Sequence, residues 1–368
     1  MNKSLIDPGR IPVWFNNSGP DSDVVISSRI RLARNLENHR FPMHATINER
    51  KQIFTEISES IKSESRFRNF EILNFSNLQK IEQQYFVEER LVSPDVLNIE
   101  GERGVAFDLN RNYNIMINEE DHIRMQCLDS GFKPQELWES INSTDDILGR
   151  KLKFAFDQRR GFLTCCPTNS GTGMRLSFLL HLPGLVLTKA IDAVLQGASQ
   201  MGISTRGFFG EHSEVVGNLF QLSNQATMGA HEQEFISSTK KIITDVIGHE
   251  RTARNKILKE ANLEISDKVY RAYGILLYAK TLSVMEVLNL TSALRMGISC
   301  NLFNLLTIED LNRITLMSMP AHLQMLRGVQ SDDSAISVLR AVLVKELLTK
   351  RKRKRITSRS ENEILPSD

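Results

Sequence analysis

The stretch Val24-Val25-Ile26-Ser27-Ser28-Arg29-Ile30-Arg31 joins a short apolar strand pattern to two closely spaced arginines. Alternate side chains of an extended strand point to opposite faces, so Arg29 and Arg31 are predicted to lie on the same face. Two guanidinium groups in that arrangement form a clamp that suits phosphate oxygens. The same pattern also occurs as a solvated basic edge, so this stretch alone leaves both interpretations open.

The composition of the whole chain is that of an ordinary globular enzyme. The chain has 368 residues, of which 41% are apolar and 24% are charged, and its formal net charge is +2. Such a length is sufficient for one large domain and a smaller one. The body of the chain is nearly neutral, apart from a basic run at 350–355, so nucleic-acid binding is not expected.

The cysteines and the N-terminal residues exclude further classes of protein. Cys127, Cys165, Cys166 and Cys300 match no zinc-ligand spacing, and four cysteines make no disulfide framework in so long a chain. The first residues contain no apolar region typical of a signal peptide, and no segment approaches the length that spans a bilayer. We therefore expect a cytoplasmic protein without a membrane interaction.

Residue patterns divide the chain into a mixed part and a helical part. Thr46 and Glu49 form a capping-box pattern before an apolar stripe, and further helices are predicted at 134–147 and 187–201. Strand-like segments occur between 70 and 118 and at 161–165, 176–181, 203–209 and 216–223. Beyond about residue 230 only helical patterns remain, with predicted starts at Ser266, Ser283 and Thr307. We predict an irregular lead-in at 1–23, a catalytic domain at 24–252, a helical domain at 253–350 and a basic, polar tail at 351–368.

Three further segments combine glycine, arginine or acidic residues beside predicted strands. They are 118–124 (NEEDHIR), 165–175 (CCPTNSGTGMR) and 206–214 (RGFFGEHSE). An adjacent guanidinium would favour the thiolate of Cys166, and a glycine-hinged loop would bring Glu211 over a substrate and exclude water. Each segment also has a purely structural interpretation, as a solvated turn, as a loop with a buried cysteine or as a hairpin. No Walker A loop is present, so a nucleotide would have to be held by other cations.

In this order, the motifs SSRIR, NEEDHIR, CPTN-x-GTG-x-R and RG-x-x-GE resemble those of the phosphagen (guanidino) kinase family. Within that family the chain looks like the bacterial protein arginine kinase branch. The resemblance implies an α+β fold, in which an antiparallel β-sheet flanked by helices is followed by an all-α domain. The catalytic domain would be of the guanidino kinase and glutamine synthetase-like type, and the helical domain would serve to form a homodimer.

The resemblance also implies a nucleotide site. ATP phosphates would be held by Arg29, Arg31, Arg124, Arg175 and Arg206, with Mg²⁺ bound through the phosphates and no metal ligands from the protein. Phosphoryl transfer depends mainly on positioning and charge neutralisation, which fixed guanidinium groups can supply. The full set expected to bind ATP is Ser27, Ser28, Arg29, Ile30, Arg31, Arg90, Arg124, Arg175, Leu176, Ser177, Phe178, Leu179, Arg206, Gly207, Phe208, Phe209, Gly210 and Glu211.

The acceptor implied by the resemblance is a guanidinium group, which is poorly nucleophilic because its lone pairs are delocalised. Two carboxylates can align its nitrogen with the γ-phosphorus, and one of them can take the departing proton. The family's carboxylate pair corresponds to Glu120 and Glu211. Its reactive cysteine corresponds to Cys166, so these three residues are the predicted catalytic groups.

The chain departs from the family pattern at two places. Arg90 stands where the family often has a nucleotide-contacting histidine before the L-x-S-P segment. In the bacterial branch an R-D-x-x-R-A motif binds phosphoarginine as a regulator. Here the corresponding residues begin Ile336-Ser337 and end Arg340-Ala341, so the leading Arg-Asp pair is missing.

The leading functional hypothesis is a protein arginine kinase that acts on exposed arginines of other proteins. In the family this modification marks proteins for a Clp-type protease or inactivates a heat-shock repressor, and a small zinc-binding protein assists as activator. A kinase for a small free guanidine metabolite is the first alternative. A catalytically silent adaptor that binds client arginines is an alternative from a different class.

Overall fold

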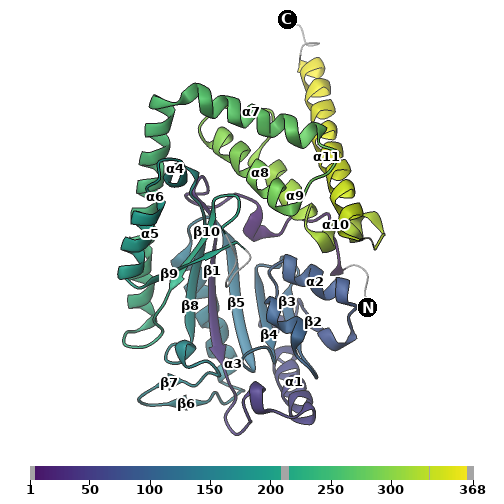
Figure 1. Ribbon diagram of the computed structural model, residues 1–368. Coiled ribbons are helices and arrows are strands. Elements are labelled where there is room, and N and C mark those ends of the chain that lie inside the picture. The colour runs from purple at the N-terminus through teal and green to yellow at the C-terminus, as the bar shows by residue number, and fades with distance from the viewer. Residues whose placement is uncertain (1–4, 209–214, 331, 363–368) are drawn as a thin grey trace, which may run out of the picture.

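The computed structural model describes residues 5–208, 215–330 and 332–362, with side chains described up to residue 349. These residues form one eight-stranded sheet whose neighbouring strands are all antiparallel, in the order β2-β3-β4-β5-β1-β8-β10-β9 (Figure 1). The strands are β1 Val25–Arg34, β2 Phe70–Asn74, β3 Gly104–Asp108, β4 Tyr113–Ile117, β5 Ile123–Ser130, β8 Met174–His181, β9 Ile203–Gly207 and β10 Leu219–Asn224, and a separate small hairpin pairs β6 Phe156–Asp157 with β7 Gly161–Phe162. The predicted antiparallel sheet is confirmed.

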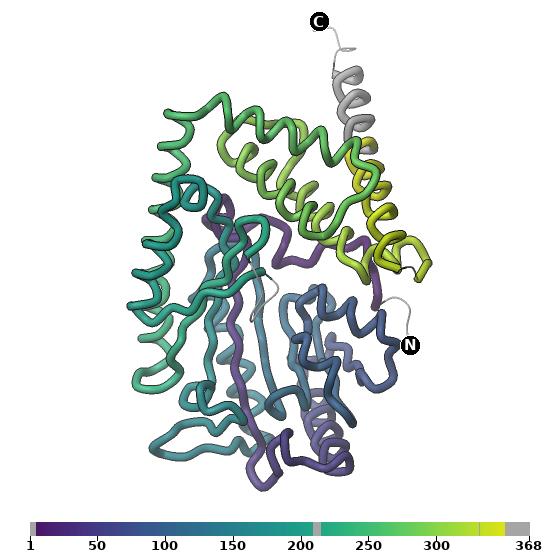
Figure 2. Tube along the Cα trace, in the orientation of Figure 1, coloured from purple at the N-terminus to yellow at the C-terminus, as the bar shows by residue number. Residues whose placement is uncertain are grey.

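Helices accompany the sheet along the first part of the chain and then continue without strands. The first group consists of α1 Ile47–Lys62, α2 Lys80–Glu88, α3 Pro134–Gly149, α4 Pro183–Leu187, α5 Ile191–Gln200 and α6 Glu232–Glu260. The second consists of α7 Asn262–Tyr278, α8 Val284–Ser299, α9 Ile308–Met317, α10 Pro320–Arg327 and α11 Asp333–Asn362. The second group gathers at one end of the sheet, as the green-to-yellow segments of Figure 2 show. The predicted change to an all-helical region is thus confirmed.

The alternation of side chains gives the central strands one apolar face. Ile30 of β1 lies opposite Cys127 of β5 and Leu176 of β8. All three are buried in the main hydrophobic core, together with apolar residues of α1, α3 and α6. The opposite face of the same strands carries the intervening residues, which include Arg29 and Arg31. The core therefore fixes the strands that present the arginines.

Helix α1 illustrates how local sequence builds the layer behind the sheet. Thr46 is its N-cap, and a capping box with Glu49 satisfies backbone donors at the first turn. Ile53, Ile57 and Ile61 are buried at helical spacing and contribute to the main core. The capping box and the apolar stripe were both predicted, and both are confirmed.

Of the three helix starts predicted in the second part of the chain, two are confirmed and one is wrong. Ser283 and Thr307 are the N-caps of α8 and α9, as expected. The start predicted at Ser266 is wrong, because α7 begins at Asn262, directly after Ala261 at φ −141°. No side-chain hydrogen bond caps that start, so the sequence carries no capping signal there.

Two of the three segment boundaries predicted from the sequence, those after residues 252 and 350, fall inside continuous helices. The boundary after residue 252 lies inside α6, which ends at Glu260, and the first part of the segment 351–368 belongs to α11. The division into domains stays a prediction. No helix in the described part of the chain is long and apolar enough to cross a membrane.

Candidate active site

Arginines from four strands lie on the polar face of the sheet. Arg31 of β1 pairs with Arg175 of β8, and Arg124 of β5 pairs with Ala33, two residues from Arg31 on the same face. Arg206 of β9 pairs with Gln221 of β10. Because paired residues of antiparallel strands project to the same side, the register brings these arginines together.

Neutral side chains hold two of these guanidinium groups. Arg29 donates through Nε to Ser177 Oγ at 3.1 Å and through Nη2 to Gln221 Oε1 at 3.2 Å. Arg175 donates through Nη2 to Ser223 Oγ at 3.2 Å. Such partners fix the orientation of a guanidinium group without neutralising its charge. Gln221 and Ser223 were not predicted as site residues. The only feature of the sequence that could have placed them on the polar face is their alternation on β10.

The charges of neighbouring arginines act on one another. Burial, followed by the charges of Arg31 and Arg90, lowers the pKa of Arg29 well below its usual value. Burial and then the charges of Arg124 and Arg175 lower the pKa of Arg31 to about 9. A lowered arginine pKa means that the charged form is destabilised at this place. A bound polyanion would relieve that destabilisation, so the observed residues fit the triphosphate of ATP.

Arg124 makes ion pairs with two carboxylates. Its Nη1 lies 2.6 Å from Glu119 Oε2, and its Nη2 contacts Glu120 Oε2. Burial alone would lower the pKa of Arg124, but the charges of Glu119 and Glu120 outweigh burial and raise it. Glu119 was not predicted as a site residue, and a run of three acids in the sequence does not show which one is buried.

The two glutamates occupy different environments. The side chain of Glu119 is fully buried and also accepts a hydrogen bond from Ser93. The side chain of Glu120 is 38% exposed. Burial raises the pKa of Glu120, with Arg124 opposing the shift. Glu120 is therefore the one that an incoming substrate can reach, and a raised pKa brings a carboxylate closer to that of a working base.

A buried aspartate links the acidic segment to the cysteine loop. Asp121 Oδ1 accepts hydrogen bonds from Asn35 Nδ2 at 2.7 Å and from the backbone N–H of Cys165 at 2.8 Å. Cys166 follows directly, and its Sγ lies 2.9 Å from Thr168 Oγ1. Asp121, which follows Glu120 in the chain, thus holds the backbone beside Cys166 close to the acidic segment.

The remaining predicted nucleotide residues fall into three sets. Ser28, Ile30, Leu176 and Phe178 project to the apolar side, where their side chains are fully buried. Ser27, Ser177, Leu179, Gly207 and Phe208 lie on or beside the polar face or at its edge, and Arg90 arrives from the end of α2. Phe209, Gly210 and Glu211 lie outside the described residues. Among the described residues, no group of three or more histidine, cysteine, aspartate or glutamate side chains could hold a metal ion.

Comparison with protein families assigns the class to which this fold and site belong. Residues 51–253 match the family model described as ATP:guanido phosphotransferase, C-terminal catalytic domain. Residues 262–359 match the one described as Protein-arginine kinase McsB C-terminal domain. The chain belongs to the ATP:guanido phosphotransferase family, and within it to the protein-arginine kinases.

Relatives at the level of whole chains agree with that placement. A protein-arginine kinase from Halalkalibacterium halodurans is 39% identical over 90% of this chain and 95% of its own length. One from Bacillus cereus is 38% identical over 92% of this chain and 96% of its own length.

Solved structures share the fold at lower identity. The duplicated taurocyamine kinase from Schistosoma mansoni, with bound transition-state analogue components, gives a TM-score of 0.59 at 24% identity, over 67% of this chain and 36% of that one. Lombricine kinase gives a TM-score of 0.56 at 22% identity, over 67% of this chain and 70% of that one.

The histidine of the acidic segment generates a prediction about pH. His122 Nδ1 accepts from the backbone N–H of Leu36, and Nε2 donates to the carbonyl of Arg40, so the folded protein holds a neutral imidazole. Burial lowers the pKa of His122 to about 4. Below the usual histidine pKa of about 6.5, the unfolded chain binds a proton that the folded chain does not, so stability falls with pH until about pH 4.

We therefore expect acidification to destabilise the wild type more than the variant His122→Gln, which cannot titrate at this site. Between pH 7 and pH 5 the wild type should lose about 2 kcal/mol more of its free energy of unfolding than the variant. Urea denaturation at the two pH values measures the difference. His249→Gln, at an exposed position of α6, is the control and should behave as the wild type does. Parallel losses in the wild type and in His122→Gln would contradict the prediction.

Proposed function

We propose that the protein transfers the γ-phosphoryl group of ATP to the guanidinium group of arginine residues in other proteins. The observation that carries the proposal is the arrangement on the polar face, where arginines from four strands adjoin a carboxylate that remains accessible. A polyanion and a cationic acceptor can meet at such a boundary between positive and negative charge. The relatives from Halalkalibacterium halodurans, Brevibacillus brevis and Desulforamulus reducens are named protein-arginine kinases, which supports arginine in proteins as the acceptor.

The nucleotide end of the site would be formed by Arg29, Arg31, Arg124, Arg175 and Arg206. Their planar guanidinium groups offer paired donors to phosphate oxygens and remain charged during turnover. Mg²⁺, bound through the phosphates, would neutralise further negative charge on the transferred group. The protein's own contribution is a rigid set of positive charges, because the core behind the sheet fixes the strands that carry them.

The acceptor end would be formed by Glu120, Glu211 and Cys166. Glu120 has the solvent access and the raised pKa that a proton acceptor needs. A second carboxylate from Glu211 would fix the other side of the planar guanidinium group, and the Cys166 thiolate would polarise it. The proton lost from the attacking nitrogen would pass to Glu120 as the N–P bond forms and the bond between the γ-phosphorus and the bridging oxygen breaks, which releases ADP.

The wider role of the protein is part of the same proposal. We place it in the cytoplasm as a homodimer, with phosphorylation that marks clients for a Clp-type protease or inactivates a heat-shock repressor, assisted by a small zinc-binding activator. The match of residues 262–359 to the C-terminal domain of protein-arginine kinases supports a protein substrate over a free guanidine metabolite. The accessible Glu120, close to the arginines of the polar face, argues for catalysis rather than a silent adaptor.

The function is tested by phosphoarginine-preserving mass spectrometry of an unfolded client protein incubated with the enzyme and Mg-ATP. We expect phosphoarginine on the client with wild type, and at least a hundredfold slower formation with Glu120→Gln, because a positioned base contributes about 10²–10⁴ in rate. Glu139→Gln, at an exposed position of α3, is the matched control and should retain full activity.

Parallel reactions with free arginine distinguish the alternatives. Phosphate on free arginine but not on the client would establish the small-metabolite kinase. Retention of client binding without phosphate transfer or ADP release in wild type would establish the adaptor.

The clustered arginines predict opposite effects on stability and binding. Replacing Arg31 by Gln removes one charge that its neighbours destabilise, so the ligand-free protein should become more stable by about 1 kcal/mol. The same change removes charge-assisted hydrogen bonds to phosphate and should weaken Mg-ADP binding by about 10- to 100-fold. Thermal unfolding and titration calorimetry measure the two effects. Arg271→Gln, at an exposed position of α7, should change neither, and equal Mg-ADP affinity in wild type and Arg31→Gln would contradict a phosphate role.

A further inference from the structure

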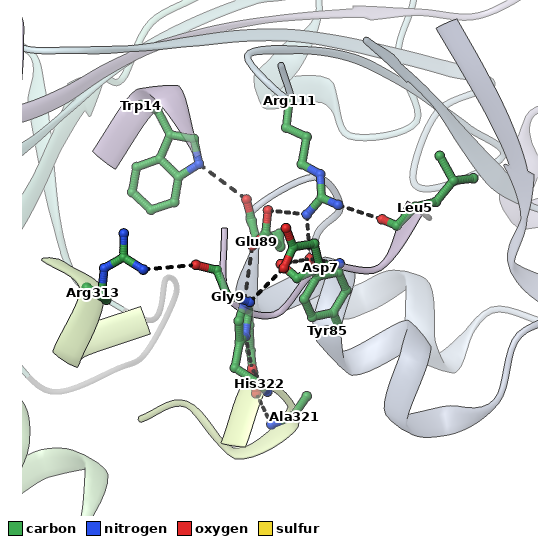
Figure 3. A network of polar contacts seen from close by, with 11 residues as sticks. Leu5, Asp7, Gly9, Trp14, Tyr85, Glu89, Arg111, Arg313, Ala321 and His322 are labelled. Atoms are coloured by element: carbon green, nitrogen blue, oxygen red, sulfur yellow. Dashed lines mark hydrogen bonds and ion pairs between the residues drawn. The ribbon is translucent and has the colours of Figure 1, made fainter. Parts of the chain in front are cut away.

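A histidine of the helical region is enclosed by two glutamates of the catalytic region. His322 lies in the first turn of α10, and its Nδ1 is 2.7 Å from Glu88 Oε2 while its Nε2 is 3.1 Å from Glu89 Oε1 (Figure 3). Glu88 also accepts from the backbone N–H groups of Ala321 at 2.8 Å and His322 at 3.1 Å. The exposed fractions of the side chains are 0% for His322 and Glu89 and 6% for Glu88. We call His322, Glu88 and Glu89 the clamp. It joins α10 to the end of α2 through direct contacts between buried side chains.

The geometry of the clamp favours a doubly protonated imidazole. Both ring nitrogens face carboxylate oxygens, and a nitrogen without a proton could not donate to a carboxylate. Burial lowers the pKa of His322, but the hydrogen bonds and charges of Glu88 and Glu89 outweigh burial and raise it. The resulting imidazolium bridges the two carboxylates.

Other charged and titratable groups surround the clamp. Glu89 Oε2 is 2.7 Å from Arg111 Nη1, and the same nitrogen donates to the hydroxyl of Tyr85. The Tyr85 ring lies 4.7 Å from that of His322, measured between centroids. Burial lowers the pKa of Arg340 of α11, and the charge of Glu88 opposes that shift. Two carboxylates thus face an imidazolium and one guanidinium in direct contact, a balanced set that explains how so many ionisable groups are buried together.

The glutamate at the centre of the clamp precedes Arg90. Glu89 is the C-cap of α2, and Arg90 follows it at φ +60°, the left-handed conformation that glycine usually supplies at this place. The backbone N–H of Arg90 donates to Val87 O at 2.9 Å and that of Leu91 to Phe86 O at 3.1 Å, which is the Schellman pattern. This conformation is unfavourable for a residue with a Cβ, so the surrounding contacts must hold Arg90 there.

The side chain of Arg90 reaches the nucleotide end of the polar face. Its Nη2 donates to the carbonyl of Phe208 at 2.9 Å, and its guanidinium carbon lies 4.5 Å from the centroid of the Phe208 ring. The guanidinium carbon of Arg90 lies 5.3 Å from the centroid of the Trp14 ring. Trp14 also donates through Nε1 to the carbonyl of Glu89 at 3.3 Å. The charge of Arg90 contributes to the lowered pKa of Arg29, which places the two guanidinium groups in one electrostatic site.

We propose that His322 is a positioning residue for the nucleotide site, which fixes the end of α2 through Glu88 and Glu89 and thereby holds Arg90 in its left-handed conformation beside Phe208. The inference rests on the proposed function, since it takes the polar face to bind a nucleotide. It assigns to the helical region a direct part in nucleotide affinity, because α10 supplies the imidazolium that neutralises the end of α2.

The pH dependence of binding follows in sign from the raised pKa of His322. The imidazolium is fully present below the usual histidine pKa and is lost as the pH rises through the higher value of the folded protein. Two facing carboxylates then lose their shared partner and repel each other. Nucleotide affinity should accordingly be highest at the lower end of the pH range and decrease as the pH rises.

The test measures the dissociation constant of Mg-ADP by calorimetry on the full chain, so that no acceptor protein is needed. We expect a loss of affinity of about tenfold in His322→Gln and a similar loss in Arg90→Ala, with no further loss in the double variant, because both act through the same side chain. His249→Gln should bind as wild type does. Wild-type affinity in His322→Gln, or losses that multiply in the double variant, would overturn the inference.

Glu88→Gln provides a second test if His322→Gln does not fold. The amide oxygen can still accept from the backbone N–H of Ala321, but the substitution removes one of the charges that raise the pKa of His322. The loss of Mg-ADP affinity with rising pH should then begin at a lower pH than in wild type, and an unchanged profile would overturn the inference. Wild type that does not bind Mg-ADP at all would instead refute the proposed function, and the inference with it.

Discussion

The collection of like charges on one face of an antiparallel sheet is the constraint on which the rest of the structure depends. Guanidinium groups that approach one another out of solvent destabilise the folded protein, as the lowered pKa values of Arg29 and Arg31 record. Strand alternation supplies the compensation, since the residues between the arginines, such as Ile30 and Leu32, are fully buried in the core. Ser177 and Gln221 then hold the guanidinium group of Arg29 in place without adding a negative charge. An acidic partner at each arginine would stabilise the empty protein and weaken its hold on a phosphate.

The sequence predicted the elements that are encoded by neighbouring residues. The antiparallel sheet, the capping boxes at Thr46 and Thr307 and the common face of Arg29 and Arg31 follow from local patterns, or from motifs in a fixed order. What it missed depends on distant strands and helices meeting. Gln221 and Ser223 acquire meaning only because β10 pairs beside β8, and His322 only because α10 docks on α2. A start without a cap, at Asn262, gave no local signal at all.

The acidic segment shows why a motif can identify a site without showing which of its residues has which role. Glu119 and Glu120 are adjacent and chemically alike, and a pattern assigns one of them only through resemblance. The fold separates them, because β4 ends at Ile117 and the turn into β5 directs Glu119 inward to Arg124 and Ser93. Glu120 shares Arg124 and keeps access to solvent. One carboxylate therefore orients the arginine, and the other remains available to a substrate.

Residues 336–341, which the resemblance aligns with a phosphoarginine-binding motif, make packing interactions. Ile336 is buried with Met317, Leu323 and Leu343, and a charged residue at that position would have no room for a hydration shell. The guanidinium of Arg340 donates to the carbonyls of Ser318 and Leu282, at 2.8 Å and 2.7 Å, so its donors are directed into the helical region rather than toward a ligand. Ser318 lies between α9 and α10, four residues before His322. Arg340 thus anchors the backbone that leads into α10. His322 of α10 then contacts Glu88 and Glu89, which directly precede Arg90.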